Sequence, residues 1–178
     1  MLAYHDREWG VPHHDDRALF ELLTLEGAQA GLSWRTILAR REEYRRAYHD
    51  FHIKRIAGMR DSSLEKLLAE SGIIRNRLKV YSVRDNARVA LDVIAEHGSL
   101  DAYLWSFVEG RPQVNRWCDS NQVPATTELS DRMSKALGKR GFRFVGSTIC
   151  YAFMQATGMV NDHLVSCFRY KESEHAEH

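Results

Sequence analysis

Hydrophobic residues recur at helical spacing along most of the chain, and runs that alternate apolar with polar residues are scarce. The clearest stripe is Leu19, Leu22 and Leu23, and its next helical step is position 26, where the chain carries Glu26 in place of an apolar residue. Asp15 or Asp16 can cap this helix at its start, and a glycine at position 31 breaks it. The pattern therefore predicts a helix with one carboxylate on its buried face.

Similar patterns predict helices along the rest of the chain. They run from Ser33 through Tyr48, over a short turn at 53–57, from a Ser62–Glu65 capping box to Gly72, from the following hairpin to Gly98, from Ser99 through Phe107, over 129–137 to Gly138, and from Ser147 to Gly158. Residues 110–124 hold two of the three prolines and form the one long irregular connection. We expect an all-α fold with a single domain over residues 1–170 and a disordered charged tail over 171–178.

Composition narrows the class of protein. The 178 residues, 44% hydrophobic and 28% charged, suit a soluble globular domain, and no apolar run approaches the ~20 residues that cross a bilayer. The net charge of +1 argues against a protein that coats nucleic acid, although it permits a local basic face. The three cysteines form no disulfide framework, and no secretion leader is evident, so we expect a cytoplasmic protein.

The carboxylate of Glu26 lies close in sequence to Trp34, and Tyr4 and Trp9 supply further rings. A buried acid beside aromatic rings suits a flat, electron-poor or cationic ring that offers N–H groups. Such a set can grip a nucleobase that has left its duplex. The alternatives stay open at this point: Glu26 can be a core acid satisfied by a backbone amide or an arginine, and the tryptophans can be core residues.

A predicted hairpin between two helices follows Gly72 and carries Arg75, Arg77 and Lys79. Backbone amides at the start of the second helix can hold a phosphate, and the basic side chains would surround it with positive charge. We expect such a contact to position DNA without reading its sequence, and we interpret Lys79 as a solvated DNA contact rather than a Schiff-base nucleophile. The alternative is an ordinary αα-hairpin with a basic turn.

A metal site is a third hypothesis. His163 and Cys167 are four residues apart, a spacing that places both on one face of a helical turn, and His5 is a candidate third ligand. One imidazole and one thiolate favour zinc, and a metal that joins the two ends of the chain would be structural. Asp6 or Asp162 can orient a ligand. By spacing alone, a histidine at a helix end beside a buried cysteine is the alternative.

These segments occur in order as five motifs. They are Tyr4-His5-Asp6-x-Glu8-Trp9-Gly10-Val11-Pro12, Leu25-Glu26-Gly27-x-Gln29-Ala30-Gly31-Leu32-Ser33-Trp34, Ser71-Gly72-Ile73-Ile74-Arg75, Lys139-Arg140-Gly141-Phe142-x-Phe144-Val145-Gly146, and Asn161-Asp162-His163 with Cys167. Together they closely resemble the bacterial DNA-3-methyladenine glycosylase I family, from Tyr4 to about Cys167. Long motifs at matching spacing make the resemblance specific.

The resemblance implies an all-α helix-hairpin-helix DNA glycosylase fold with two helical lobes, the base pocket between them and a structural zinc site joining the termini. It places the helix-hairpin-helix element at about 62–97. The implied activity is monofunctional excision of 3-methyladenine from alkylated double-stranded DNA in base excision repair, with free 3-methyladenine as product and a monomeric enzyme.

The resemblance also assigns roles to individual residues. Glu26 matches the acid that recognises the base, and Tyr4 and Trp34 match the rings that stack on it. Gly31 and Leu32 match the loop that wedges into the duplex. His5, His163 and Cys167 match three of the four zinc ligands. The family lacks the catalytic aspartate of other helix-hairpin-helix glycosylases, so we expect Glu26 to select the cationic base over neutral adenine.

The sequence departs from the family pattern in one respect. The fourth family ligand is a cysteine upstream of the Tyr-His-Asp motif, and only three residues precede Tyr4 here. Three interpretations stay open: the true start lies upstream, water or His13 or His14 completes the site, or the metal is lost. The rival functions are a non-catalytic DNA- or base-binding relative and a zinc-dependent hydrolase.

Overall fold

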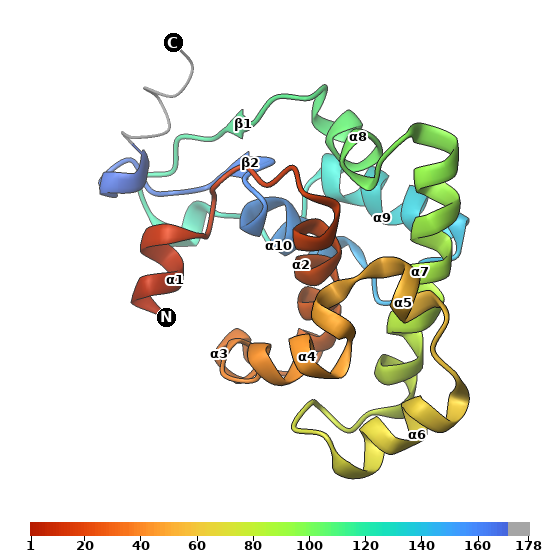
Figure 1. Ribbon diagram of the computed structural model, residues 1–178. Helices are drawn as coiled ribbons and strands as arrows, with labels where there is room; N and C mark the ends of the chain where they lie inside the picture. The colour runs from red at the N-terminus through yellow and green to blue at the C-terminus, as the bar shows by residue number, and fades with distance from the viewer. Residues whose placement is uncertain (171–178) are drawn as a thin grey trace.

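The computed structural model describes residues 1–170, and the predicted disordered tail over 171–178 lies outside the described residues. Helices dominate the described chain, as expected (Figure 1). The elements in chain order are α1 (Leu2–Arg7), α2 (Asp16–Gln29), α3 (Trp34–Leu38), α4 (Arg41–Ala47), η1 (His49–Phe51), α5 (Ile53–Ala57), α6 (Asp61–Glu70), α7 (Arg77–His97), α8 (Leu100–Trp105), η2 (Ser106–Val108), β1 (Gln113–Val114), η3 (Ser120–Gln122), α9 (Glu128–Arg140), α10 (Ser147–Ala156) and β2 (Val160–Asn161).

Helix α2 is the centre of the core. The Asp15 side chain caps it by accepting the Ala18 amide at 2.9 Å, as the sequence predicts. Every residue from Leu19 to Ala28 is buried, and the helix packs against α3, α7, α8 and α10. Because α2 is buried on all sides, Glu26 lies in the interior together with Leu19, Leu22 and Leu23. The predicted burial of this carboxylate is confirmed.

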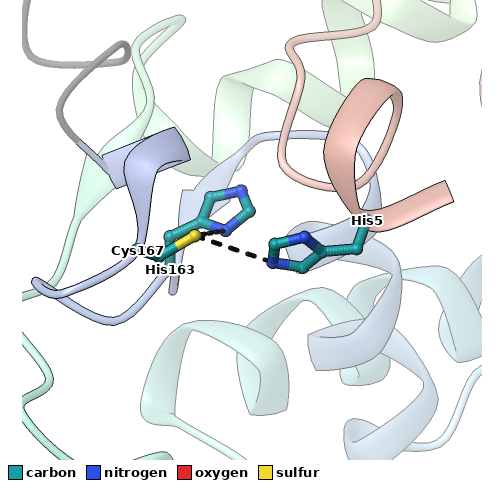
Figure 2. Close-up of side chains that lie close together, drawn as sticks. All are labelled: His5, His163 and Cys167. Carbon is teal, nitrogen blue, oxygen red and sulfur yellow. Dashed lines mark hydrogen bonds between the residues drawn. The ribbon is translucent and has the colours of Figure 1, made fainter. Parts of the chain in front are cut away.

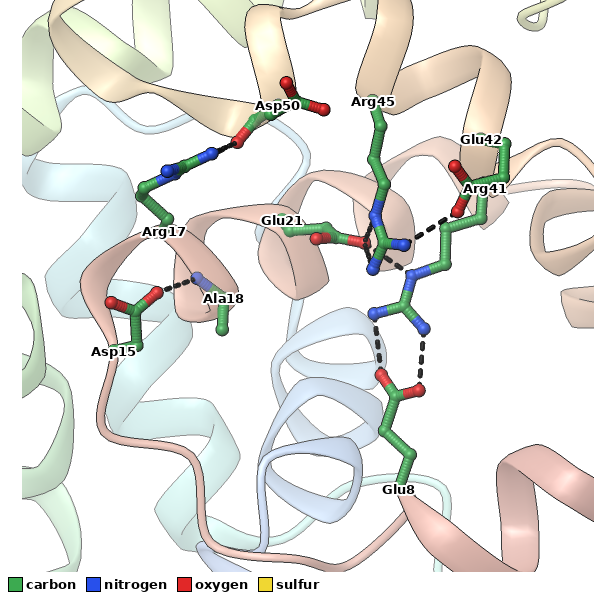
Figure 3. Close-up of polar contacts among 9 residues, drawn as sticks. All are labelled: Glu8, Asp15, Arg17, Ala18, Glu21, Arg41, Glu42, Arg45 and Asp50. Carbon is green, nitrogen blue, oxygen red and sulfur yellow. Dashed lines mark hydrogen bonds and ion pairs between the residues drawn. The ribbon is translucent and has the colours of Figure 1, made fainter.

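The single helix predicted from Ser33 through Tyr48 is wrong, because the chain breaks it into α3 and α4. Ser33 does cap α3 by accepting the Thr36 amide, but Arg40 leaves the helical conformation with φ −105° and ψ 6°. The break sets α4 where Arg41 reaches the Glu21 carboxylate of α2 at 2.5 Å (Figure 3). A tertiary ion pair thus accompanies a bend that local spacing does not reveal.

The predicted capping box of α6 is also wrong. The helix begins at Asp61, after Arg60, which makes no side-chain cap, and the Asp61 carboxylate instead receives Arg84 at 2.5 Å. Gly72 adopts no left-handed conformation, because the helix already ends at Glu70. A Cβ at this position would lie 2.7 Å from the Glu43 side chain, which would have to move aside.

Helix α9 continues through Gly138, where the sequence predicted its end, and stops at Gly141 with φ 101°. Glycine inside a helix costs only about 1 kcal/mol, so Gly138 does not have to end the helix, whereas the left-handed conformation of Gly141 does end it. The other predicted boundaries at Gly98, Ser99 and Ser147 agree with the structure within a residue.

Two short strands were not expected. β1 and β2 pair in parallel, with Gln113 opposite Val160 and Val114 opposite Asn161. The pairing fastens the irregular connection of residues 110–124 to the segment that follows α10. Among residues 1–170, no helix combines the length and the apolar character that a bilayer crossing requires.

Candidate functional site

A cavity of about 310 Å³ opens among α1, α2, α3 and α10. Its lining residues are Met1, Tyr4, His5, Trp9, Glu26, Gln29, Trp34, Ala152 and Gln155. The structure therefore brings together Tyr4, Glu26 and Trp34, the three residues that the sequence proposed as a base-binding set. The volume lies at the lower end of the range for small-molecule sites, which suits one flat heterocycle.

Glu26 is buried in this cavity with 4% of its surface exposed. Its Oε2 atom has no hydrogen-bond partner among the described residues, so the alternative of a core acid satisfied by an amide or an arginine is wrong. Burial raises the pKa of the carboxyl to about 8. An acid held in this way is costly to the fold and is free to accept a hydrogen bond from a ligand.

Two aromatic side chains carry further unpartnered polar atoms into the same cavity. Tyr4 and Trp34 lie with ring centroids 5.5 Å apart and planes tilted by 49°. The Tyr4 hydroxyl and the Trp34 Nε1 are buried without a partner in the described chain. Burial, and then the neighbouring Glu26, raises the pKa of Tyr4, so its phenol stays protonated and able to donate.

Trp9 lines the cavity and also packs against two histidines outside the proposed base-binding set. Its ring lines the cavity, stacks on His5 at 6.0 Å between centroids, and meets His163 edge-on at 4.6 Å. The interpretation of Trp9 as a packing residue and its place in the aromatic set are therefore both correct.

Sequence reasoning missed Gln29, Ala152 and Gln155 as lining residues. Of these three residues, Gln155 could have been found from the sequence, because it is a polar residue in the otherwise apolar α10. Its Nε2 donates to Asp162 at 2.8 Å, which fixes the amide at the edge of the cavity. Ala152 carried no signal, because a small apolar residue in an apolar helix is typical of any core.

A larger hollow of about 780 Å³ lies elsewhere, between α9 and the connection around residues 107–117. None of its lining side chains has a buried polar atom left without a partner in the described chain. Size alone therefore does not mark the site, and the smaller cavity with its three unsatisfied polar groups is the stronger candidate.

Figure 2 shows the second cluster, in which His5 from α1 faces His163 and Cys167 near the other end of the chain. The Cys167 Sγ lies 3.7 Å from the His5 Nε2 and 3.7 Å from the His163 Nδ1. All three ligand atoms lie within 4.8 Å of one another. This spacing and donor set suit a tetrahedral zinc ion.

The outer nitrogen of each imidazole is already engaged. His5 Nδ1 contacts the Asp6 carboxylate at 2.8 Å, and His163 Nε2 contacts the Trp9 carbonyl at 3.2 Å. Such contacts orient the inner nitrogens toward a metal. Burial lowers the pKa of His163 to about 4, which keeps its imidazole neutral. A glycine at position 10 is required here, because a Cβ would lie 2.7 Å from the His163 Nε2.

The structure decides between alternatives that the sequence left open for this cluster, because Asp6 is the acid that contacts a candidate ligand, His5. Asp162 does not orient His163; its carboxylate accepts hydrogen bonds from a set of other side chains, namely Asn115, Trp117, Tyr151 and Gln155. His14 is directed elsewhere, with its Nδ1 2.8 Å from Asp101 and its ring stacked on Trp105. Among residues 1–170, neither His13 nor His14 joins the three clustered ligands.

The basic residues of the connection between α6 and α7 differ in their surroundings. Arg75 is exposed, and the described chain gives it no ion pair. Arg77 pairs with both oxygens of Glu65. Lys79 points inward and donates from its Nζ to the Ala28 carbonyl at 2.9 Å and to the Ala30 carbonyl at 2.5 Å. The interpretation of Lys79 as a solvated side chain is therefore wrong.

The loop between α2 and α3, residues 30–33, joins Gln29 to Trp34, which both line the cavity, and we call it the wedge loop after the role that the resemblance implies for it. Gly31 has φ +76°, a conformation that side chains disfavour, and it reverses the chain after α2. Leu32 follows with 40% of its surface exposed, and its amide donates to the Gln29 carbonyl at 2.6 Å. An exposed leucine on a fixed loop is suited to contact a partner surface.

A mostly helical protein with a ring-sized cavity, a buried acid that has no partner in the described chain and an exposed apolar loop beside the cavity has the features expected of a protein that binds an extruded planar base. Comparison with known proteins identifies the family. The methyladenine glycosylase family model matches residues 1–170, and the chain belongs to that family.

Individual relatives agree over most of their length. DNA-3-methyladenine glycosylase 1 of Escherichia coli (strain K12) is 48% identical over 169 residues, covering 95% of this chain and 90% of the relative. A crystal structure of 3-methyladenine DNA glycosylase I superposes with TM-score 0.89 at 51% identity, covering 94% of this chain and 92% of the other. A variant of 3-methyladenine DNA glycosylase I in complex with 3-methyladenine superposes with TM-score 0.92 at 34% identity, covering 94% and 90%.

Proposed function

We propose that this protein is a monofunctional DNA glycosylase that excises 3-methyladenine from alkylated double-stranded DNA by hydrolysis of the N-glycosidic bond, in base excision repair. The observation that carries the proposal is the cavity in which Glu26, Tyr4 and Trp34 each present a buried polar atom that has no partner among residues 1–170. Membership of the methyladenine glycosylase family supports the same reaction.

The chemistry of the damaged base explains why the site needs so few groups. Methylation at N3 makes the adenine cationic, so its bond to C1′ is already weak. When that bond breaks, its electron pair stays with the base, which leaves as neutral 3-methyladenine. Water adds to C1′ and releases a proton, and the product sugar is abasic. The protein's task is to extrude the base, exclude bulk water and select the cation.

Glu26 performs the selection in this proposal. Its carboxylate accepts the amino hydrogens of the base and opposes the positive charge, whereas neutral adenine supplies no such charge. In the empty cavity the carboxyl, with a pKa of about 8, holds a proton at neutral pH. Entry of the cation displaces that proton, so the site favours a charged base over a neutral one. Tyr4 and Trp34 provide the walls on which the ring stacks.

The surfaces around the cavity supply the contact with DNA. Leu32 of the wedge loop enters the stack, and the amides of Gly72 and its neighbours, with Arg75, meet the phosphates. Helices α6 and α7 form the helix-hairpin-helix element in this interpretation, and the base pocket lies between two helical lobes. A single domain over residues 1–170, a monomeric state and a cytoplasmic location stay predictions.

We also propose that His5, His163 and Cys167 hold a structural zinc ion, supported by their converging ligand atoms and engaged outer nitrogens. The ion would fasten the first helix to the C-terminal segment and would take no part in bond cleavage. Chelation should therefore lower the melting temperature, with one zinc per chain lost by elemental analysis. A zinc-dependent hydrolase would instead lose activity on chelation while its unfolding transition stayed in place.

The decisive assay measures free 3-methyladenine released from methylated duplex DNA by the purified protein, with Glu26→Ala as control. Release by the parent and its loss in the variant support the proposal. A non-catalytic relative would bind abasic DNA and release no base. Because the assay detects the free base itself, it separates a glycosylase from a protein that only binds DNA.

A further inference from the structure

The three basic residues near the α6–α7 connection have three distinct environments, and Lys79 is the unusual one. Its ammonium lies at the C-terminal end of α2, where the Ala28 and Ala30 carbonyls have no helical partner. A cation at this end of a helix is favourable because the dipole is negative there. Partial burial of Lys79 lowers the pKa of its ammonium.

The two carbonyls belong to the residues that lead directly into the wedge loop. Ala30 is the C-cap of α2, and Gly31 and Leu32 follow it. Lys79 itself lies in the first turn of α7, where its amide donates to the Asn76 side chain at 3.1 Å. One side chain therefore joins the start of α7 to the loop that presents Leu32 beside the cavity.

We propose that Lys79 is a positioning residue that fixes the wedge loop against α7, so that docking of the α6–α7 connection on the duplex sets the depth at which Leu32 enters the stack. The inference rests on the proposed function, because it assigns the wedge loop a role in base extrusion. Lys79 acts on the DNA through Leu32 and makes no phosphate contact of its own.

The test compares Lys79→Met and Lys79→Arg with Arg75→Met, a matched loss of one positive charge from the same connection. The salt dependence of binding to undamaged duplex reports phosphate contacts, and each lost contact lowers the slope by about 0.9. The single-turnover excision rate is measured with enzyme in saturating excess over DNA. All DNA is then bound, so the rate does not depend on DNA affinity. Titration with free 3-methyladenine reports the cavity alone, and 2-aminopurine beside the lesion reports opening of the stack without requiring excision.

For Lys79→Met we expect the parental salt slope, the parental affinity for free 3-methyladenine, a smaller 2-aminopurine signal and excision slowed by about tenfold or more. Lys79→Arg should recover part of the loss, because a longer cation can still reach the carbonyls. Arg75→Met, which removes a proposed phosphate contact, should instead lower the salt slope and weaken binding to the duplex, with parental affinity for free 3-methyladenine.

Three outcomes would overturn the inference. A Lys79→Met slope that falls as in Arg75→Met would make Lys79 a phosphate contact. Loss of affinity for free 3-methyladenine in step with excision would show damage to the cavity rather than to the wedge loop. Parental excision and parental 2-aminopurine signal would show that the link is dispensable. Failure of the parent to release 3-methyladenine would contradict the proposed function alone, since the 2-aminopurine signal still tests the link.

Discussion

Helix α2 carries two buried acids, and they have opposite surroundings. Glu21 is 8% exposed and accepts from Arg41 at 2.5 Å and from Arg45 at 3.0 Å, within a network that extends to Glu8 (Figure 3). Glu26 is 4% exposed and has no partner among the described residues. The exposed fraction therefore does not distinguish the two acids, whereas their partners do: Glu21 is an acid of an ion-pair network, and Glu26 is left available to a ligand.

The largest expected difference between them is in activity. Glu26→Ala should lower excision of 3-methyladenine at least about 100-fold, because the group that opposes the base's charge is gone. Glu26→Gln should lose most of the activity as well, since an amide accepts a hydrogen bond but carries no charge. Single-turnover release from alkylated DNA measures the loss, and binding to abasic DNA serves as the control. Parental release by Glu26→Gln would sink the selection mechanism.

Glu21 should show the opposite profile. Glu21→Gln should lower the free energy of unfolding by about 2 kcal/mol, because Arg41, whose side chain is 15% exposed, keeps only Glu8 as a charged partner. Below the unfolding transition, its excision rate should stay parental. Glu42→Gln is the matched control, since that carboxylate is 71% exposed beside Arg45 and its loss should cost less than about 0.5 kcal/mol. Urea titrations of the parent, Glu21→Gln and Glu42→Gln measure the free energy of unfolding of each. An equal loss in the two variants would contradict the expectation that a buried ion pair costs more to break than an exposed one.

The acids should also differ in their effect on pH dependence. Because the folded-state pKa of Glu26 is raised to about 8, the folded chain binds a proton that the unfolded chain releases near 4.5. Protonated Glu26 therefore adds its full contribution to the free energy of unfolding below pH 4.5. This contribution is lost as pH rises from 4.5 toward 8, by at most about 1.4 kcal/mol per pH unit.

Glu26→Gln removes this dependence, so its stability relative to the parent should increase from pH 5 to pH 8. Urea titrations of both proteins across this range measure the difference, in which the common contributions of His13 and His163 cancel. A difference that stays constant with pH would show that Glu26 titrates normally.

The sequence revealed a large part of the site because its signal was local. The position of Glu26 in an apolar stripe predicted its burial, and the Asp15 cap and the helix starts at Ser33 and Ser99 were confirmed. Each of these features depends on residues within a few positions, where helical spacing holds.

Features that depend on tertiary contacts could not be read in the same way. The break between α3 and α4 is accompanied by the contact of Arg41 with Glu21, and the inward direction of Lys79 depends on carbonyls about 50 positions away in sequence. The pairing of β1 with β2 joins segments too short to give an alternating pattern. Charge and periodicity locate such residues on an element but do not reveal which distant group they meet.

Tyr4 and His5 are neighbours on α1, yet one forms a wall of the cavity with Trp34 and the other faces Cys167. A six-residue helix is too short to bend between them, so the two sites share one rigid support. A displacement of the α1 backbone that withdraws His5 from Cys167 would also shift the Tyr4 ring relative to Trp34. An insertion between these two residues would therefore turn one side chain away from its partner by about 100° around the helix and disrupt at least one of the two sites.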